Sequence, residues 1–192
     1  MTRRLVLLRH GATDWNAAGR LQGRADIGLS ETGRAALTGC TVPAAYRDRQ
    51  WYASPLRRTQ ETAALLGLQP QIEPALIEMD WGQYEGRTLP ELREAYGSAF
   101  TANEDRGLDL QPPGGESPRQ VQQRLLPWLR GLPADAGAVT HKGVIRAVLA
   151  LAFDWPMLGR APVKLDWHCL QEFSITEDGR PSLVAANIPL ER

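Results

Sequence analysis

Apolar residues along the chain gather into short blocks that are typical of strands separated by helices. Residues 4–8, RLVLL, form a continuous apolar run of the kind found in a strand buried on both faces. We predict a second strand at residues 50–53 (QWYA) and a third at residues 137–141 (GAVTH). Two more are expected from Leu165 onward, in the segments LDWHCLQEFSI and SLVAANI.

Helix signals lie between these strands. Ser54 is a good N-terminal cap, Pro55 suits the first helical position and Gly67 suits the stop, so SPLRRTQETAALLG predicts one helix. The same Ser-Pro start recurs in SPRQVQQRLLPWLRG, where Pro127 is expected to kink the helix. Further helices are predicted in ETGRAALTG (residues 31–39), in PELREAYG from Pro90, and in the largely apolar KGVIRAVLALAF.

Strands that alternate with helices indicate an α/β fold with a mostly parallel sheet. The chain has 192 residues, of which 43% are hydrophobic, which suits one globular domain over residues 1–192. Ligands of such folds bind at the carboxyl ends of the strands. Arg9 and His10 end the first predicted strand and His141 ends the third, so two of the three histidines lie where a site is expected.

Charge and cysteine content narrow the possible functions. The 22 basic and 22 acidic residues balance, so no large basic field is available to hold nucleic acid. No apolar run is long enough to span a bilayer, and the run in MTRRLVLLRH is too short for a signal peptide. Cys40 and Cys169 provide neither a disulfide framework nor a zinc-ligand spacing. A cytoplasmic protein without membrane or nucleic-acid partners is therefore expected.

The segment RHGATDWN holds the first candidate residues. Arg9 and His10 would point to opposite faces of an ideal strand. Both reach one site only if the strand is already turning, which Gly11 permits. The same residues also fit a buried structural histidine beside a surface arginine.

The helix start in ASPLRRTQETA is the second candidate. A helix N-terminus offers free N–H groups and partial positive charge, which suit an anion. Arg57 and Arg58 lie about 100° apart around such a helix, so one of them is expected to face the site. A guanidinium there can grip two phosphate oxygens. Two solvated arginines on a surface helix are the alternative.

Acidic residues in ALIEMDWGQYEGRT are the third candidate. Glu78 and Asp80 flank a short apolar segment, and Glu85 follows. Trp81 and Tyr84 can desolvate a carboxyl group and raise its pKa, as a proton donor requires. Ordinary exposed acids in a loop are the alternative.

His141 is the fourth candidate, because it closes an apolar strand where Lys142 and Gly143 open a helix, although it also fits a structural histidine. Histidines, arginines and helix starts can together form a cationic pocket. The sequence contains no HExxH or CxxC metal motif, no GxxxxGK[ST] or GxGxxG nucleotide motif and no GxSxG serine motif. A cationic pocket without a metal, a cofactor or a nucleotide loop favours covalent phosphoryl transfer through histidine.

The four segments RHGATDWN, SPLRRTQET, LIEMDWGQYEG and VTHKG occur together and in this order, between residue 5 and about residue 146. In this combination the chain resembles the histidine phosphatase superfamily, which has the phosphoglycerate mutase-like fold. The resemblance implies a three-layer α/β/α sandwich around a mostly parallel central sheet.

The resemblance also implies roles for individual residues. His10 would be the nucleophile that becomes phosphorylated, while Arg9 and His141 would bind the phosphoryl group. The family's S-x-L-x-R pattern matches Ser54, Leu56 and Arg58, so Arg58 rather than Arg57 would lie in the pocket.

Four further matches complete the implied site. Glu78 matches the family's proton donor and Asn16 a phosphate-contacting asparagine, whereas Gln22 and Gly23, with Thr13 nearby, lie where substrate contacts are usual.

Elementary chemistry agrees with these roles. Only a neutral imidazole attacks phosphorus, and Arg9 and Arg58 favour that form by repelling a positive charge. The same arginines stabilise negative charge on the transferring oxygens. Glu78 would protonate the leaving alkoxide and then accept a proton from the attacking water.

Some residues depart from the family pattern. Lys142 stands where the family often has glycine, and it either reaches a second anionic group on the substrate or faces solvent. His168 matches no family motif and is expected to be structural, and Arg146 either supports the site or lies on the surface. Residues 155–167 mix aromatic rings with cations and form either a flap or an interface.

Chain length bears on the reaction. Phosphoglycerate mutases of this superfamily carry an inserted segment with further basic residues before the second histidine, whereas here YGSAFTANEDRGLDLQPPGGES is short and holds Arg106 alone. We therefore predict a phosphatase acting on a small phosphorylated metabolite, either an α-ribazole phosphatase or a sugar-phosphate phosphatase. A phosphoglycerate mutase and a non-catalytic phosphate-binding protein of the same fold are the alternatives. A homodimer is compatible with the sequence, which does not define the oligomeric state.

Overall fold

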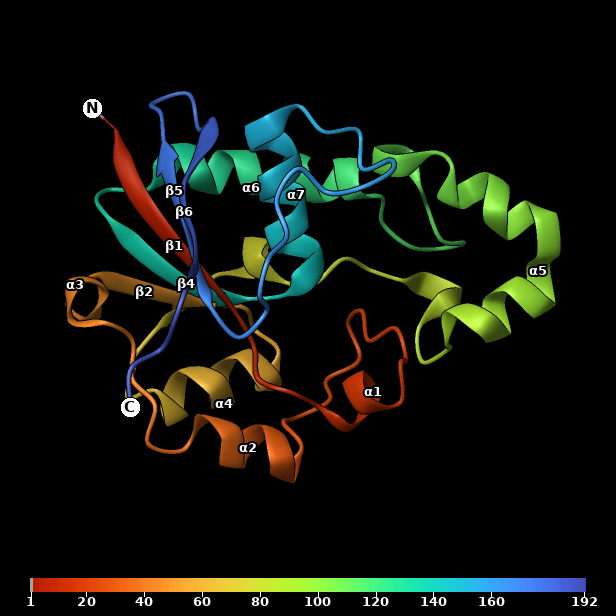
Figure 1. The fold of residues 1–192 in the computed structure, drawn as a ribbon. Coiled ribbons are helices and arrows are strands. Elements are labelled where there is room, and N and C mark those ends of the chain that lie inside the picture. Colours follow the sequence, from red (N-terminus) through yellow and green to blue (C-terminus); the bar gives the residue numbers. More distant parts are fainter. Residues whose placement is uncertain (1) are drawn as a thin grey trace.

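The computed structural model describes residues 2–192, and their strands form one six-stranded sheet (Figure 1). The strands are β1 (Arg3–Arg9), β2 (Gln50–Ala53), β3 (Gln71–Ile72), β4 (Ala136–Thr140), β5 (Leu170–Ile175) and β6 (Pro181–Ile188). They lie in the order β3-β2-β4-β1-β5-β6. The first four are parallel to one another, and β5 pairs antiparallel with both β1 and β6.

Helices cover both faces of this sheet, as Figure 1 shows. They are α1 (Asp14–Ala17), α2 (Glu31–Leu37), α3 (Ala44–Arg47), α4 (Arg57–Leu65), α5 (Leu89–Glu104), α6 (Pro118–Gly131) and α7 (Lys142–Phe153). Short 3₁₀ turns occupy Pro74–Leu76, Gly82–Tyr84 and Gly107–Asp109. Helices α6 and α7 lie on one face and α2 and α4 on the other, which confirms the predicted three-layer α/β/α arrangement.

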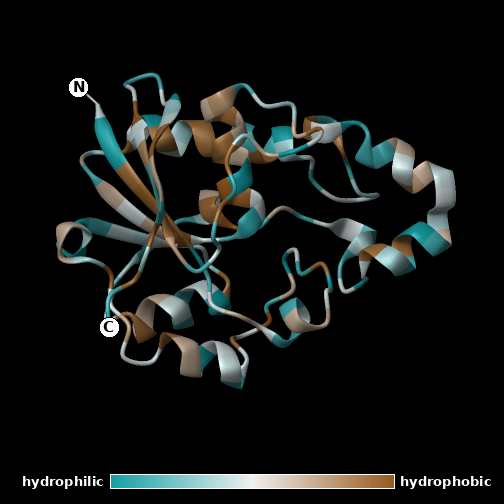
Figure 2. Ribbon diagram, in the orientation of Figure 1, coloured by the Kyte–Doolittle hydropathy of each residue, from teal (hydrophilic) through white to brown (hydrophobic). Residues whose placement is uncertain are grey.

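The apolar run of β1 divides between two cores because successive side chains of a strand point to opposite faces. Leu5 and Leu7 pack in the core under α6 and α7, whereas Val6 and Leu8 pack in the core under α4. Burying each such side chain stabilises the fold by about 1.5–3 kcal/mol. In Figure 2 the hydrophobic colour accordingly runs along the central strands and α7.

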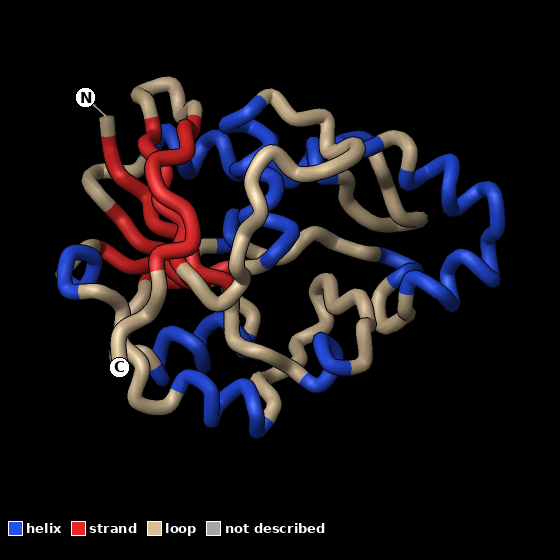
Figure 3. Tube along the Cα trace, viewed as in Figure 1, coloured by secondary structure: helices blue, strands red, loops and turns tan. Residues whose placement is uncertain are grey.

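The carboxyl ends of the parallel strands meet at one edge of the sheet. His10 follows β1, Ser54 follows β2 and His141 follows β4. The backbone N–H of His10 donates to Thr140 O (3.0 Å), and that of Ser54 donates to Val139 O (3.2 Å). Loops leave the strands at this edge toward α5 (Figure 3). The structure therefore confirms that both strand-end histidines lie where an α/β sheet places ligands.

The predicted helix cap at Ser54 is wrong. Helix α4 begins at Arg57, with Leu56 as its extended cap residue (ψ 137°), so residues 54–56 lie outside the helix and bend the chain between β2 and α4. The Ser54 hydroxyl accepts a bond from Leu56 N–H (3.3 Å) and contacts His141 instead of capping the helix. The predicted stop is confirmed, because Gly67 adopts a φ of +71° directly after the helix.

Other boundaries differ from the sequence-based expectations for non-local reasons. Helix α5 does not end near Gly97 but bends there, at φ 51° and ψ −130°, and continues to Glu104. Residues 165–169 form a turn rather than a strand, because Asp166 N–H is held by Asn187 Oδ1 (2.6 Å). Among residues 2–192 no helix combines the length and the apolar character that a bilayer span requires.

Helix α2 packs directly on the loop that follows His10. The carbonyl of Ala12 accepts bonds from Ser30 N–H (2.9 Å) and from the Ser30 hydroxyl (3.2 Å). Gly33 lies against the same carbonyl so closely that an added methyl group would overlap it. The glycine therefore allows the helix to brace this loop.

We expect Gly33→Ala to lower the free energy of unfolding by about 1–3 kcal/mol, because the methyl group must displace the backbone of Ala12. Chemical denaturation monitored by circular dichroism measures the loss. Gly131→Ala is the matched control, since an added Cβ there meets no atom within 4 Å. Equal stability of the two variants would contradict the packing argument.

Candidate active site

A pocket of about 640 Å³ opens at the carboxyl edge of the sheet. Its wall includes most of the residues that the sequence singles out: Arg9, His10, Asn16, Gln22, Gly23, Arg58, Glu78 and Lys142. His141 and Thr13 are buried behind this wall, with 0% and 1% of their surface exposed. Both ends of α5 reach the opposite side, through Leu89 and Glu104.

His10 presents one specific ring nitrogen to the pocket. Its Nδ1 lies 2.7 Å from the carbonyl of Gly11, and because a carbonyl only accepts, Nδ1 carries the proton. The neutral ring then keeps a lone pair on Nε2. Burial, followed by the charges of Arg9 and Arg58, holds the pKa of His10 well below its ordinary value of 6.5. The imidazole is therefore uncharged and nucleophilic near neutral pH.

The turn after His10 is fixed from α4. The backbone N–H of Gly11 donates to Thr62 Oγ1 (2.9 Å), and this hydroxyl in turn donates to the carbonyl of Arg58 (2.6 Å). The chain leaves the sheet immediately after His10, so Arg9 and His10 both line the pocket although they are adjacent in sequence. This resolves the strand-geometry problem that the sequence raised.

Arg58, not Arg57, faces the pocket. Its guanidinium is fully buried and donates to the carbonyls of Ala25 and Gly23, each at 2.8 Å, and to His141 Nδ1 at 3.3 Å. Arg57 instead extends along the surface and pairs with Glu61 (3.2 Å). Burial lowers the pKa of Arg58, and nearby carboxyl groups oppose that shift. The guanidinium keeps its charge, since arginine stays protonated in proteins.

His141 is held from both sides in a neutral form. Arg58 Nε donates to its Nδ1, so the ring proton resides on Nε2, which donates to Ser54 Oγ at 2.8 Å. Burial, then the neighbouring His10 and Arg58, lower the pKa of His141 well below 6.5. The two imidazoles stand with ring centroids 5.2 Å apart. A group that binds between them meets two neutral rings and a buried cation.

Glu78 enters the pocket on the segment after the first 3₁₀ turn. Its carboxyl oxygens accept bonds from Met79 N–H (2.8 Å) and Gly143 N–H (3.2 Å). Burial raises the pKa of Glu78 above its ordinary value of 4.5, although these bonds and the charges of Arg58 and Arg9 oppose the shift. Any side chain at position 143 would overlap the Glu78 carboxylate. A carboxyl group in this environment suits a proton donor.

The other acids of that motif serve the loop structure. Asp80 accepts a bond from Gly82 N–H (2.8 Å) and pairs with Arg24 (3.4 Å). Glu85 accepts from the backbone N–H of Arg24 (3.1 Å). Neither acid lines the pocket, so Glu78 is the acid of this motif that the structure brings to it.

Asn16 and Thr13 form a reciprocal cap at the start of α1. Asn16 Oδ1 accepts from Thr13 N–H (3.0 Å) and from the Thr13 hydroxyl (3.1 Å). This engages the amide oxygen, so the amide N–H groups of Asn16 are the donors left for an anion. Thr13 positions Asn16 and does not itself line the pocket. Gln22 is also buried, and its Oε1 has no partner.

Besides Arg9 and Arg58, three further cations line the pocket: Arg20 from the loop after α1, and Lys142 and Arg146 from α7. Lys142 and Arg146 lie one turn apart on α7. Trp167 lies beneath Lys142 and Arg9, with its ring 5.3 Å from Lys142 Nζ and 6.0 Å from Arg9 Cζ. His168 is exposed and absent from the pocket wall.

Sequence reasoning missed three supporting residues. The sequence predicts Ser54 as a helix cap and Trp167 as part of a strand, whereas Ser54 contacts His141 behind the pocket wall and Trp167 contacts Lys142 in it. Thr62 holds the turn after His10. Its spacing of four residues from Arg58 places both on one helix face, and this signal could have identified it.

The fold is that of the histidine phosphatases. The solved structure of a mycobacterial glucosyl-3-phosphoglycerate phosphatase is similar over 98% of this chain and 100% of its own, with a TM-score of 0.77 and 28% identity. The family model described as "Histidine phosphatase superfamily (branch 1)" matches residues 5–189, and the chain belongs to this superfamily. The predicted family and the prediction of an enzyme are thereby confirmed.

Curated relatives include phosphatases and mutases. Glucosyl-3-phosphoglycerate phosphatase of Mycolicibacterium vanbaalenii is 37% identical over 179 residues, which cover 82% of this chain and 79% of the relative. A 2,3-bisphosphoglycerate-dependent phosphoglycerate mutase of Methylorubrum populi is 34% identical over 146 residues, covering 67% and 65% of the two chains.

We expect His10 to remain unprotonated at pH 6.5, because burial and two neighbouring cations lower its pKa. Replacing Arg9 by glutamine removes one like charge, so the pKa of His10 should rise toward its ordinary value. Nuclear magnetic resonance of ¹⁵N-labelled imidazoles during an acid titration measures both values. Titration of His10 at or above pH 6.5 in the wild-type protein would contradict the assignment.

Proposed function

We propose that the protein is a phosphatase that hydrolyses a small phosphorylated sugar or a related metabolite through a phosphohistidine on His10. The observation that carries this proposal is the bond from His10 Nδ1 to Gly11 O, which leaves Nε2 unprotonated beside Arg9 and the buried Arg58. A lone pair aimed into a cationic pocket is suited to attack on a phosphate ester.

The proposed reaction has two steps that share one proton carrier. His10 Nε2 forms a bond to phosphorus while the ester P–O bond breaks, and the Glu78 proton moves to the leaving alkoxide. Water then attacks phosphorus, the P–N bond breaks, and the Glu78 carboxylate accepts the proton of the water. Arg9, Arg58 and Asn16 hold the phosphoryl oxygens in this scheme, and His141 joins them by exchanging its Nε2–H bond to Ser54 for one to the phosphoryl group. The products are an alcohol and inorganic phosphate, and both side chains regain their starting forms.

Hydrolysis is favoured over the mutase reaction by the segment between Glu78 and His141. Three of its arginines are already paired with acids: Arg93 with Glu104, Arg119 with Asp109, and Arg124 with Glu116. These three arginines therefore do not form the free basic cluster that the inserted segment of a mutase provides. The relatives named glucosyl-3-phosphoglycerate phosphatase favour a phosphosugar over α-ribazole phosphate as the substrate.

Trapping the intermediate tests this proposal. Rapid quenching of the wild-type protein with a phosphate-labelled ester should show an acid-labile adduct on His10. His10→Ala should fold but lose turnover by a factor of at least about 10³, because no other group can accept the phosphoryl group. Absence of the adduct, or an unchanged rate in the variant, would refute the covalent route. Phosphate binding without any turnover by the wild-type protein would instead support the non-catalytic alternative.

Changing the leaving group tests the role of Glu78. Glu78→Gln should slow phosphohistidine formation from an alkyl phosphate about 10²–10⁴-fold, because the alkoxide then leaves without a proton. The same step with p-nitrophenyl phosphate should change far less, since nitrophenolate is a stable leaving group. Stopped-flow or quench measurement of the first turnover separates the two cases. Asp80→Asn, which retains the acceptor for Gly82 N–H, is the matched control, and equal slowing of both esters would count against Glu78 as the proton donor.

A further inference from the structure

The wall of the pocket formed by α7 carries more positive charge than one phosphoryl group requires. Lys142 and Arg146 both line the pocket that contains His10. Residues four apart share one helix face, with Cβ atoms about 5–6 Å from each other. Lys142 directly follows His141 at the start of α7, and Arg146 lies four residues further along the helix. Both cations therefore lie beyond the proposed phosphoryl site.

These cations lack acidic partners. Within residues 2–192 neither Lys142, Arg146 nor Arg9 forms an ion pair with a carboxylate. The Nε of Arg9 is buried without a hydrogen-bond partner. Glu104, on the far side of the pocket, is paired with Arg93 at 3.0 Å. Burial lowers the pKa of Lys142, and the charges of Arg9 and Arg146 lower it further, although the nearby Glu78 partly opposes the shift.

Two tryptophans support the cations without neutralising them. Trp167 contacts Lys142 and Arg9, and the Trp155 ring lies 5.0 Å from Arg146 Cζ. Such cation–π contacts orient a positive side chain but leave its charge available to a ligand. Both rings belong to residues 155–167, a segment that also contributes Met157 to the pocket. This segment therefore acts as a support for the charged wall.

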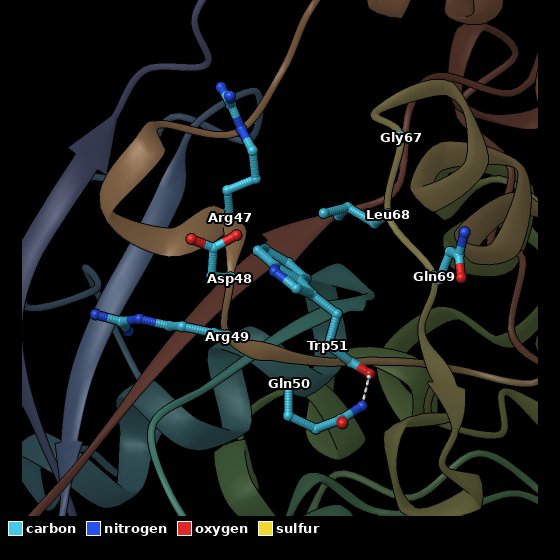
Figure 4. A pocket seen from close by; sticks show the side chains of 8 residues that line it. All are labelled: Arg47, Asp48, Arg49, Gln50, Trp51, Gly67, Leu68 and Gln69. Carbon is cyan, nitrogen blue, oxygen red and sulfur yellow. Dashed lines mark hydrogen bonds between the residues drawn. The ribbon is translucent and has the colours of Figure 1, made fainter.

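Arginines in a second hollow of the surface are arranged differently. That hollow, of about 290 Å³, lies at the start of β2 (Figure 4). There Arg49 pairs with Glu172 at 3.2 Å and Arg47 with Glu191 at 3.8 Å. Cations on this surface are thus matched by acids, whereas those on α7 are not.

We propose that Lys142 and Arg146, adjacent to Arg9, form a second anion-binding subsite, so that the preferred substrates carry a carboxylate or a second phosphate several ångströms from the scissile phosphorus. This inference rests on the proposed phosphatase function and specifies its substrate class. The subsite provides two donors of full positive charge, and charge-assisted hydrogen bonds are about twice as strong as neutral ones.

Matched pairs of esters test the subsite. 3-Phosphoglycerate and glycerol 3-phosphate differ only in a carboxylate, and fructose 1,6-bisphosphate and fructose 6-phosphate differ only in a second phosphate. We expect kcat/KM of the wild-type enzyme to be about tenfold or more higher for the doubly anionic member of at least one pair. Which pair shows the preference identifies the anion.

Variants locate that preference on α7. Lys142→Gln and Arg146→Gln should each lower the ratio of kcat/KM within the preferred pair about five- to tenfold, mainly through KM. Arg160→Gln is the control, because Arg160 is an exposed cation of residues 155–167 that does not line the pocket. A wild-type ratio near one for both pairs would overturn the inference, and so would a ratio that survives both substitutions.

Calorimetry separates this inference from the proposed function. His10→Ala should bind 3-phosphoglycerate or the bisphosphate more tightly than its singly phosphorylated partner, and adding Lys142→Gln should remove the difference. Failure of the wild-type protein to turn over any ester would refute the phosphatase proposal but leave this binding difference measurable. Equal binding of both members of each pair would refute the subsite alone.

Discussion

The charge of Arg58, which has no exposed surface, is the constraint on which the pocket depends. An isolated ion in a protein interior costs several kcal/mol unless it is well paired. Here the carbonyls of Gly23 and Ala25 and the ring of His141 supply the partners. Because the two carbonyls belong to the loop between α1 and α2, satisfying this one guanidinium also fastens that loop beside the catalytic edge of the sheet.

The charge of Arg58 also affects the two groups that would act as base and acid, His10 and Glu78. Burial is the largest influence on both His10 and Glu78, yet it acts in opposite directions. It disfavours whichever form is charged, so it favours the neutral imidazole of His10 and the protonated carboxyl group of Glu78. Two groups whose pKa values are displaced in opposite senses can exchange acid and base duties at one pH. The arginines strengthen the first shift and oppose the second, which leaves Glu78 able to lose its proton during the reaction.

The sequence predicts those parts of the fold and of the site that depend on residues close together in the chain. Strand β1 was predictable because its side chains are apolar on both faces, and the strand ends placed His10 and His141 together. Family motifs distinguished Arg58 from Arg57, which helical geometry alone had left open. The pocket wall beyond these motifs, including Arg20, Leu21 and Met157, comes from segments that no periodicity connects.

Contacts between distant residues account for what was not predicted. Ser54 satisfies the rules for a helix cap, but its partner is His141, 87 residues further along the chain. Helix α5 continues beyond the bend at Gly97 because Leu92 and Phe100, on either side of that bend, pack together with Tyr84. Strand β3 is two exposed residues long, too short for a pattern of alternation to be recognised.

The close fit of Gly143 against Glu78 has a consequence for how this enzyme class diversifies. At the start of α7, a side chain at position 143 would have to displace the Glu78 carboxylate, while the position before it and the one three residues after it line the pocket. Under the roles proposed above, substitutions at positions 142 and 146 can therefore change which metabolite is bound without displacing the carboxylate of Glu78. In this proposal, neighbouring positions at the start of one helix separate the placement of the proton donor from the selection of the substrate.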